Sequence, residues 1–370
     1  MVWILAIWCG LKFLRWLPVE PVYGVLVGVL VVSLSAVIHP ISGSAPTDLI
    51  FVLLACAAGL KQSEAQWRVG LWLILATVIV SLPFVEFDRL NSNIDAIPWS
   101  VLRDALPQEA VRIQRITINR SGYLYGLFAL VGYGLFRAEM RPWLSRLAAV
   151  GGGLSFVLAL GAASRAAFLF PIAAVLVTEL CWRNRQWVAK RARSLTALVL
   201  ILALLFNLAL YWPGSPMVAE EPSDLGRAKV AQCFVSHSLR SLPDFLLGQG
   251  YDRVSEHCAK RVFLPGRIEG IPHAHNVFLH ALADQGLVTL ILMLMAVWLV
   301  FQRLLLGLAG DAGSLCRTGL ACALFILASS LVESTLLKTS LQQVVSGYLL
   351  AIAWVAPMPS KQENLRTIGS

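Results

Sequence analysis

Long, continuous runs of apolar residues separated by short polar windows dominate the sequence. The clearest runs are 25–38, 71–85, 124–136, 195–211 and 288–301. A helix of about 20 mainly apolar residues crosses about 30 Å of hydrocarbon, and it satisfies its backbone groups within its own segment. The strands of a membrane barrel would alternate apolar and polar residues, and these runs do not. The pattern therefore predicts an all-α protein that crosses a membrane several times.

We expect about eleven membrane helices. The first and third are short for a full crossing. The first eleven residues also have the apolar character of a signal peptide, but no basic segment precedes them and no Ala-x-Ala site follows, so we expect a retained helix. Residues 1–370 are predicted to form one membrane domain with two long loops, at 86–120 and 213–272. The predicted spans are 2–17, 21–38, 48–60, 67–85, 121–136, 144–162, 166–182, 195–212, 274–301, 316–333 and 338–356.

Basic residues predict which loops face the cytoplasm. Charged residues make up only 14% of the chain, and the formal net charge is +9. Lys and Arg accumulate in cytoplasmic loops. The 86–120 and 213–272 loops carry nearly balanced charge, so we expect them to face outward, and the positive surplus requires no nucleic acid. The alternate connections carry Lys12, Arg15, Lys61, Arg68, Arg137, Arg141, Arg146, Arg183, Arg185, Lys190, Arg191, Arg193, Arg303, Arg317, Lys361 and Arg366.

Two of the seven cysteines, Cys233 and Cys258, lie in the second outer loop. A disulfide would close this loop in an oxidising compartment. Zinc bound by these cysteines with His237 and His257 is the alternative, although adjacent ligands at 257 and 258 fit tetrahedral geometry poorly. The other five cysteines lie in or beside predicted helices, where a small apolar side chain fills space.

The sequence contains no glycine-rich nucleotide-binding loop and no repeat of 20–50 residues. The run Gly151–Gly153 lies in a predicted span, where small residues favour close helix packing over anion binding. No cytoplasmic domain is predicted. An ATP-driven pump is therefore not expected.

Two arginines occupy unusual positions on the predicted outer side. Ser164-Arg165 begins a span, where a basic residue opposes both the helix dipole and the charge bias of the loops. Gly226-Arg227 follows a group of acidic residues in the outer loop. Alone, Arg165 could simply reach to lipid headgroups, and Arg227 could form a solvated ion pair.

A third outer feature opens the span that begins at 274. All six histidines of the chain fall on the outer side, and His273 and His275 flank the start of this helix. A helix start favours anions and a neutral imidazole, which can act as a general base. At helical spacing, Asn276, His280 and Asp284 continue as a polar stripe into the span. An acid in a hydrophobic span needs a partner or a water-filled cavity, so the stripe indicates function.

At these residues the sequence resembles the O-antigen ligase and O-antigen polymerase superfamily. The family motif is His-Asn, nine residues, Gly and a second Gly three residues later. His275-Asn276 and Gly286 match it, and Thr289 stands at the second glycine. Segments 164–166, 225–227 and 247–251 are similar to further family motifs, a Ser-Arg-Gly/Ala segment, a loop arginine and a Gly-x-Gly turn. The resemblance covers about residues 115–335.

The resemblance implies a GT-C-like membrane glycosyltransferase with about 11–12 helices in the bacterial inner membrane and a periplasmic active site. It would act without a metal or cofactor on an undecaprenyl-diphosphate-linked glycan. A ligase transfers this glycan to a hydroxyl of the lipid A core. The expected catalytic residues are His275, Arg165 and Arg227, with the arginines on diphosphate. The expected substrate-binding residues are His273, Asn276, Arg120, Arg112 and Arg115.

Other functions are also compatible with the sequence. A polymerase of the same superfamily would transfer the glycan to a growing glycan chain. A flippase or secondary transporter would need paired charges along a path through the membrane, or inverted repeats. The inner halves of the spans offer little beyond Glu179. Transport and a purely structural role are therefore the weaker hypotheses.

Overall fold

The computed structural model confirms the all-α class. All regular secondary structure in the described residues is helical. Four described helices are long and apolar enough to cross a membrane, namely Pro142–Gly161, Ala166–Arg183, Val277–Gly307 and Gly313–Val332. The predicted spans 2–17 and 21–38 and most of 48–60 lie outside the described residues. The structure describes residues 55, 56, 59, 62–82, 118–162, 165–211, 222–250, 253–261, 274–332 and 340–355.

Eight helices occupy the predicted spans from 67 onward, and each begins and ends within six residues of its prediction. Local signals explain where several begin. Ser63 and Gln66 form a capping box before the first of them, and Pro142 occupies the first turn of another. The helices are α4 (Glu64–Ser81), α7 (Ile118–Ala138), α8 (Pro142–Gly161), α9 (Arg165–Arg183), α11 (Ala192–Tyr211), α15 (Val277–Gly307), α16 (Gly313–Val332) and α17 (Ser340–Leu350), which continues into a 3-10 turn at Ala351–Trp354.

One end of the helix bundle, called here the basic end, is defined by contacts between helix termini. Arg68 near the start of α4 donates to the carbonyl of Ala138 at the end of α7, at 3.4 Å. Arg137 at the end of α7 pairs with Glu179 in the last turns of α9 at 3.1 Å. Arg317 near the start of α16 binds the same carboxylate. The helices α4 and α16 therefore start at this end and α7 and α9 finish there, so the two pairs run in opposite directions, as the charge pattern predicts.

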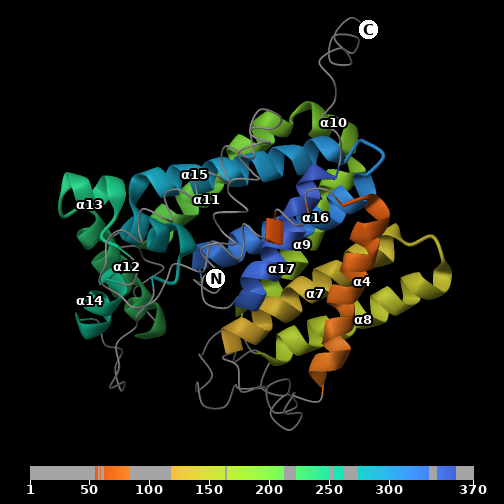
Figure 1. Cartoon of the computed structure of the whole chain (residues 1–370), viewed down its shortest axis with the longest axis horizontal. Helices are drawn as coiled ribbons and strands as arrows, with labels where there is room; N and C mark the ends of the chain where they lie inside the picture. Colours follow the sequence, from red (N-terminus) through yellow and green to blue (C-terminus); the bar gives the residue numbers. More distant parts are fainter. Residues whose placement is uncertain are drawn as a thin grey trace, which may run out of the picture.

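The opposite end, called here the motif end, brings together the end of α11, the start of α15 and the end of α16. The side chain of Asn276 donates to Asn207 on α11 and to the carbonyl of Leu331 on α16. Three shorter helices gather around this end of α15, as Figure 1 shows, and they fill part of the predicted 213–272 loop. They are α12 (Pro222–Ser238), α13 (Leu242–Leu247) and α14 (Arg253–Arg261).

Small residues let α7 and α8 approach closely. A Cβ atom built on Gly132 of α7 would lie 2.4 Å from the Cα atom of Gly152 on α8. On the same helix α8, a Cβ on Gly151 would meet the side chain of Leu75 on α4 at 3.0 Å. A Cβ on Gly153 would meet nothing within 4 Å. Two of the three consecutive glycines therefore serve close packing, as expected from the sequence.

Two of the basic residues assigned to connections are buried within helices. Arg303 is within α15, which runs six residues beyond its predicted end, and it is 7% exposed with its guanidinium over the ring of Trp354. Arg317 is within α16 and is 5% exposed. Both arginines still lie toward the basic end of their helices. Their burial is possible because aromatic rings and a carboxylate accompany them.

A short helix that the sequence did not predict, α10 (Arg185–Lys190), joins α9 to α11.

Candidate active site

Asn276 fixes the start of α15. It is the N-cap residue, and its side-chain oxygen accepts a hydrogen bond from the backbone N–H of Leu279 at 2.9 Å. Its amide nitrogen donates to the Leu331 carbonyl at 3.0 Å and to the side chain of Asn207. Asn276 is 1% exposed. Its side chain therefore ties three helices together and sets the position of the residue before it.

That preceding residue, His275, has an unusual backbone conformation. Its φ is 50°, and among the described residues it is the only non-glycine residue with a positive φ. Ala274 and Asn276 on either side are buried, whereas His275 is only partly buried. A left-handed conformation costs a residue with a side chain free energy, and such conformations cluster at functional sites. The structure thus holds the backbone of His275 in a left-handed conformation and leaves the residue partly accessible at the motif end.

The polar stripe expected on α15 is present and buried. His280 and Asp284 pair through Nε2 and Oδ2 at 3.2 Å, and they are 8% and 2% exposed. The ring of Phe234 on α12 lies against His280, with 5.6 Å between ring centroids. The acid in the hydrophobic span therefore has the partner that its location requires.

The helix is broken below this stripe, at Gly286. Its φ of 81° and ψ of −179° lie in a region that only glycine enters readily. The break leaves two carbonyl groups, of Ala283 and Asp284, available to other donors. The backbone N–H groups of Gln249 and Gly250 bind them, each at 3.0 Å. The single long helix expected from the sequence is thus two helical segments joined at a kink.

The kink receives the Gly248-Gln249-Gly250 turn that follows α13. Gly248 and Gly250 both have positive φ, at 78° and 94°. A Cβ atom on Gly248 would lie 2.4 Å from backbone atoms of Asp284. A Cβ on Gly286 would lie 2.3 Å from the carbonyl oxygen of Leu246. Glycine is needed on both sides because two backbones meet here without room for a side chain.

Thr289, at the second glycine of the family motif, is fully buried beside the kink. Its hydroxyl donates to the carbonyl oxygen of Gln285 at 3.2 Å. A threonine side chain in a helix commonly binds a carbonyl one turn back. The departure from the motif therefore leaves the kink and the His-Asn pair in place.

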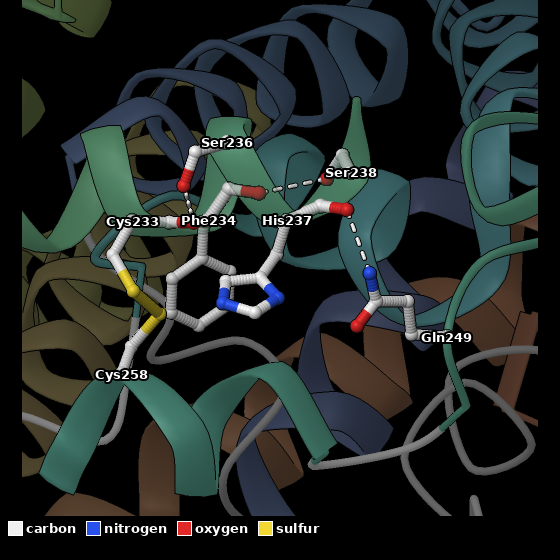
Figure 2. The surroundings of a disulfide bond; sticks show 7 residues. All are labelled: Cys233, Phe234, Ser236, His237, Ser238, Gln249 and Cys258. Atoms are coloured by element: carbon white, nitrogen blue, oxygen red, sulfur yellow. Dashed lines mark hydrogen bonds between the residues drawn. A yellow bond between two sulfur atoms is a disulfide. The ribbon is translucent and has the colours of Figure 1, made fainter. Parts of the chain in front are cut away.

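A disulfide joins Cys233 on α12 to Cys258 on α14, with 6.0 Å between the Cα atoms (Figure 2). This confirms the disulfide prediction, and it leaves neither thiol available as a zinc ligand. Beside it, the rings of His237 and His257 make an edge-to-face contact with 4.1 Å between centroids. Gln249 donates to the His237 carbonyl at 2.6 Å, which links α12 to the turn at the kink. A small second core, composed of Val230, Phe234, Val254, Cys258, Ala274 and Ala283, packs these helices onto the start of α15.

Replacing both Cys233 and Cys258 by serine is expected to lower the free energy of unfolding of the motif end by about 3 kcal/mol, since the bond closes a loop across a sequence separation of 25. Thermal unfolding of the purified protein would measure the change. Cys181→Ser is the matched control, because Cys181 is a free cysteine on α9. Equal unfolding temperatures for wild type and the double variant would contradict this expectation.

The other predicted site residues are placed only in part. Arg165 is the first residue of α9, and Arg120 lies in the first turn of α7, so both backbones are at the ends of helices away from the basic end. Arg227 lies on α12, which packs against α15. The structure does not describe the side chains of these three arginines. His273, Arg112 and Arg115 lie outside the described residues.

A charged cluster that was not predicted from the sequence lies at the basic end. Oε1 of Glu179 accepts hydrogen bonds from the hydroxyl of Tyr133 at 2.6 Å, from Arg137 and from Arg317. The Nε group of Arg317 also donates to the Tyr133 hydroxyl at 3.0 Å. A single Glu in an apolar span was the available signal. Its three partners come from two other helices and could not be paired by sequence spacing.

Comparisons with known proteins assign no family. No model of a protein family matches the chain, and a search of curated proteins finds no significant match.

Proposed function

We propose that the protein is an O-antigen ligase with a GT-C-like fold. In this proposal it transfers a glycan from undecaprenyl diphosphate to a hydroxyl of the lipid A core, and the motif end faces the periplasm. The observation that carries the proposal is His275, which is held in a left-handed backbone conformation between two buried residues at the start of α15. The His-Asn-Gly motif supports it, because its residues shape this segment. Asn276 is the N-cap of α15, and Gly286 is the site of the kink.

The proposed reaction is one displacement at the anomeric carbon of the glycan. The acceptor hydroxyl attacks this carbon, the bond to the diphosphate oxygen breaks, and undecaprenyl diphosphate leaves with the electron pair. His275 accepts the proton of the hydroxyl, a contribution of about 10²–10⁴-fold for a positioned base. Asn276, which was expected from the sequence to bind substrate, is 1% exposed, and in this proposal it positions the histidine through its three hydrogen bonds instead.

Arginine side chains would stabilise the leaving diphosphate. Arg165 and Arg227 lie on helices α9 and α12, and Arg120 lies near the start of α7. The guanidinium group stays charged and can bind two phosphate oxygens at once, so it can neutralise the diphosphate without a divalent cation. His273, Arg112 and Arg115 are the further residues proposed to contact donor or acceptor.

An assay with purified protein tests the proposed function. The protein is given a labelled lipid-linked glycan with either lipid A core or a second lipid-linked glycan as acceptor. Label transferred to the lipid A core supports the ligase. Label found only in lengthened lipid-linked glycan indicates the polymerase. Labelled donor that crosses a vesicle membrane unchanged, with no transfer, would instead indicate a flippase and refute the proposal.

The Arg→Lys substitutions separate charge from geometry at the proposed diphosphate site. Arg165→Lys and Arg227→Lys are each expected to slow transfer substantially with folding intact, because lysine keeps the charge but loses the planar fork. Arg→Ala should be slower still. The rate is measured while the donor lipid is varied. Wild-type rates in both Lys variants would indicate that Arg165 only reaches lipid headgroups and that Arg227 forms only a solvated ion pair.

A further inference from the structure

An open hollow of about 520 Å³ lies between α7 and α9 at the basic end. Its walls are apolar side chains, Phe136 on α7 and Leu176 and Leu180 on α9. These side chains face outward, and Leu176 and Leu180 are 65% and 63% exposed. They lie on helices in the bundle that contains the candidate spans, so this surface would contact lipid acyl chains.

The rim of the hollow is positively charged. Arg137 and Arg183 line it together with Glu179. Glu179 binds Arg137 and the buried Arg317, so one carboxylate stands among three arginines. Among the described residues, no ion pair joins Arg183 to an acidic side chain. The cluster therefore has a surplus of two positive charges at the point where the helices end.

The charged rim and the apolar wall lie at different positions along the axis of α9. Arg183 lies seven residues after Leu176, a rise of about 10 Å at 1.5 Å per residue. Glu179 holds one edge of the Arg137 guanidinium with three hydrogen bonds, while the side chain of Arg137 remains 44% exposed. An occupant would thus meet the guanidinium groups of Arg137 and Arg183 at one end of the hollow and an apolar wall along the rest of it. A phosphate headgroup with acyl chains has this distribution of charge and apolar surface.

We propose that this hollow binds an anionic phospholipid, with its phosphate on Arg183 and Arg137 and its acyl chains along Phe136, Leu176 and Leu180. Glu179 keeps Arg137 in position for the phosphate. The site is at the opposite end of the bundle from His275. It is therefore separate from the proposed site of glycan transfer and does not depend on it.

The test measures lipid bound to the purified full-length protein. Protein is reconstituted in bilayers that contain phosphatidylglycerol and phosphatidylcholine, and retained lipid is then counted by native mass spectrometry. Wild type is expected to retain phosphatidylglycerol preferentially. Arg183→Gln should lower this retention roughly tenfold or more, as expected for a lost charge-assisted hydrogen bond. Arg185→Gln is the matched control, since Arg185 stacks on Trp182 and does not line the hollow.

A second pair of variants tests the apolar wall without altering any charge. Leu180→Ser should also lower phosphatidylglycerol retention, whereas Leu204→Ser on α11, which is 60% exposed but away from the hollow, should not. The deacylated headgroup glycerophosphoglycerol should compete poorly. Equal retention of both lipids by wild type, equal retention by Arg183→Gln and Arg185→Gln, unchanged retention in Leu180→Ser, or full displacement by the deacylated headgroup would each overturn the proposal.

Discussion

Replacement of His275 by asparagine is expected to lower the rate of glycan transfer by about 10²–10⁴-fold and to leave the fold intact. The substitution removes the imidazole that accepts the proton. Asparagine tolerates a left-handed backbone better than other residues with a side chain, so the φ of 50° can persist. The measurement is the transfer rate with donor and acceptor at saturation, together with the unfolding temperature.

Two further variants at this position separate chemistry from conformation. His275→Gly accepts the positive φ without strain and should be as inactive as His275→Asn. His275→Ala loses the imidazole and must also bear the left-handed backbone, so it should be inactive and less stable. Transfer at the wild-type rate by the Asn or Gly variant would show that transfer requires only the left-handed backbone conformation at residue 275 and not its imidazole. The assignment of a catalytic histidine would then fail.

Gly286→Ala is expected to destabilise the motif end by roughly 2–6 kcal/mol. About 1–3 kcal/mol comes from a backbone conformation that alanine does not readily adopt, and a similar amount from overpacking. The new Cβ would lie 2.3 Å from the Leu246 carbonyl oxygen and 2.6 Å from the nitrogen of Gly248, and backbone atoms cannot move aside as a flexible side chain can. Glycan transfer should fall as well, because the same contact positions the segment that begins at His275.

Gly310→Ala is the control for this change. Gly310 lies in the connection between α15 and α16, and a Cβ there would meet its nearest neighbour at an ordinary 3.6 Å. Thermal unfolding and limited proteolysis of α12–α14 would compare the two variants. If Gly286→Ala and Gly310→Ala unfold at the same temperature and resist protease equally, the kink does not hold these helices on α15.

The eight described helices that occupy predicted spans were predictable because apolar runs set their bounds. The 166–182 prediction, for example, differs by one residue at each end from Arg165–Arg183. The helices α12–α14 were not predicted, since they are short and polar and depend on packing around a disulfide and the start of α15. Ser241 and Pro243 at the start of α13 were the local signals that could have revealed one of them.

The sequence motif at the start of α15 could be recognised, but the shape of the segment around it could not. The His275-Asn276 pair and Gly286 were recognised as a motif, yet the break in the helix requires a turn from another segment to bind the freed carbonyls. For Cys233 and Cys258 the sequence left a disulfide and a zinc site as alternatives, and the structure shows the disulfide. The pairing of Glu179 with Arg317, 138 residues away, could not be inferred from the sequence alone.

The most direct test of the central claim is the release of undecaprenyl diphosphate by the purified protein. The proposed displacement frees one molecule of this lipid for each glycan transferred. Release is therefore expected to require the lipid A-core acceptor, to equal the glycan transferred, to persist in excess EDTA because arginines stabilise the diphosphate, and to disappear in His275→Asn. Wild-type protein that releases no undecaprenyl diphosphate in the presence of donor and acceptor, or releases it only when Mg²⁺ or Mn²⁺ is restored, would contradict the account.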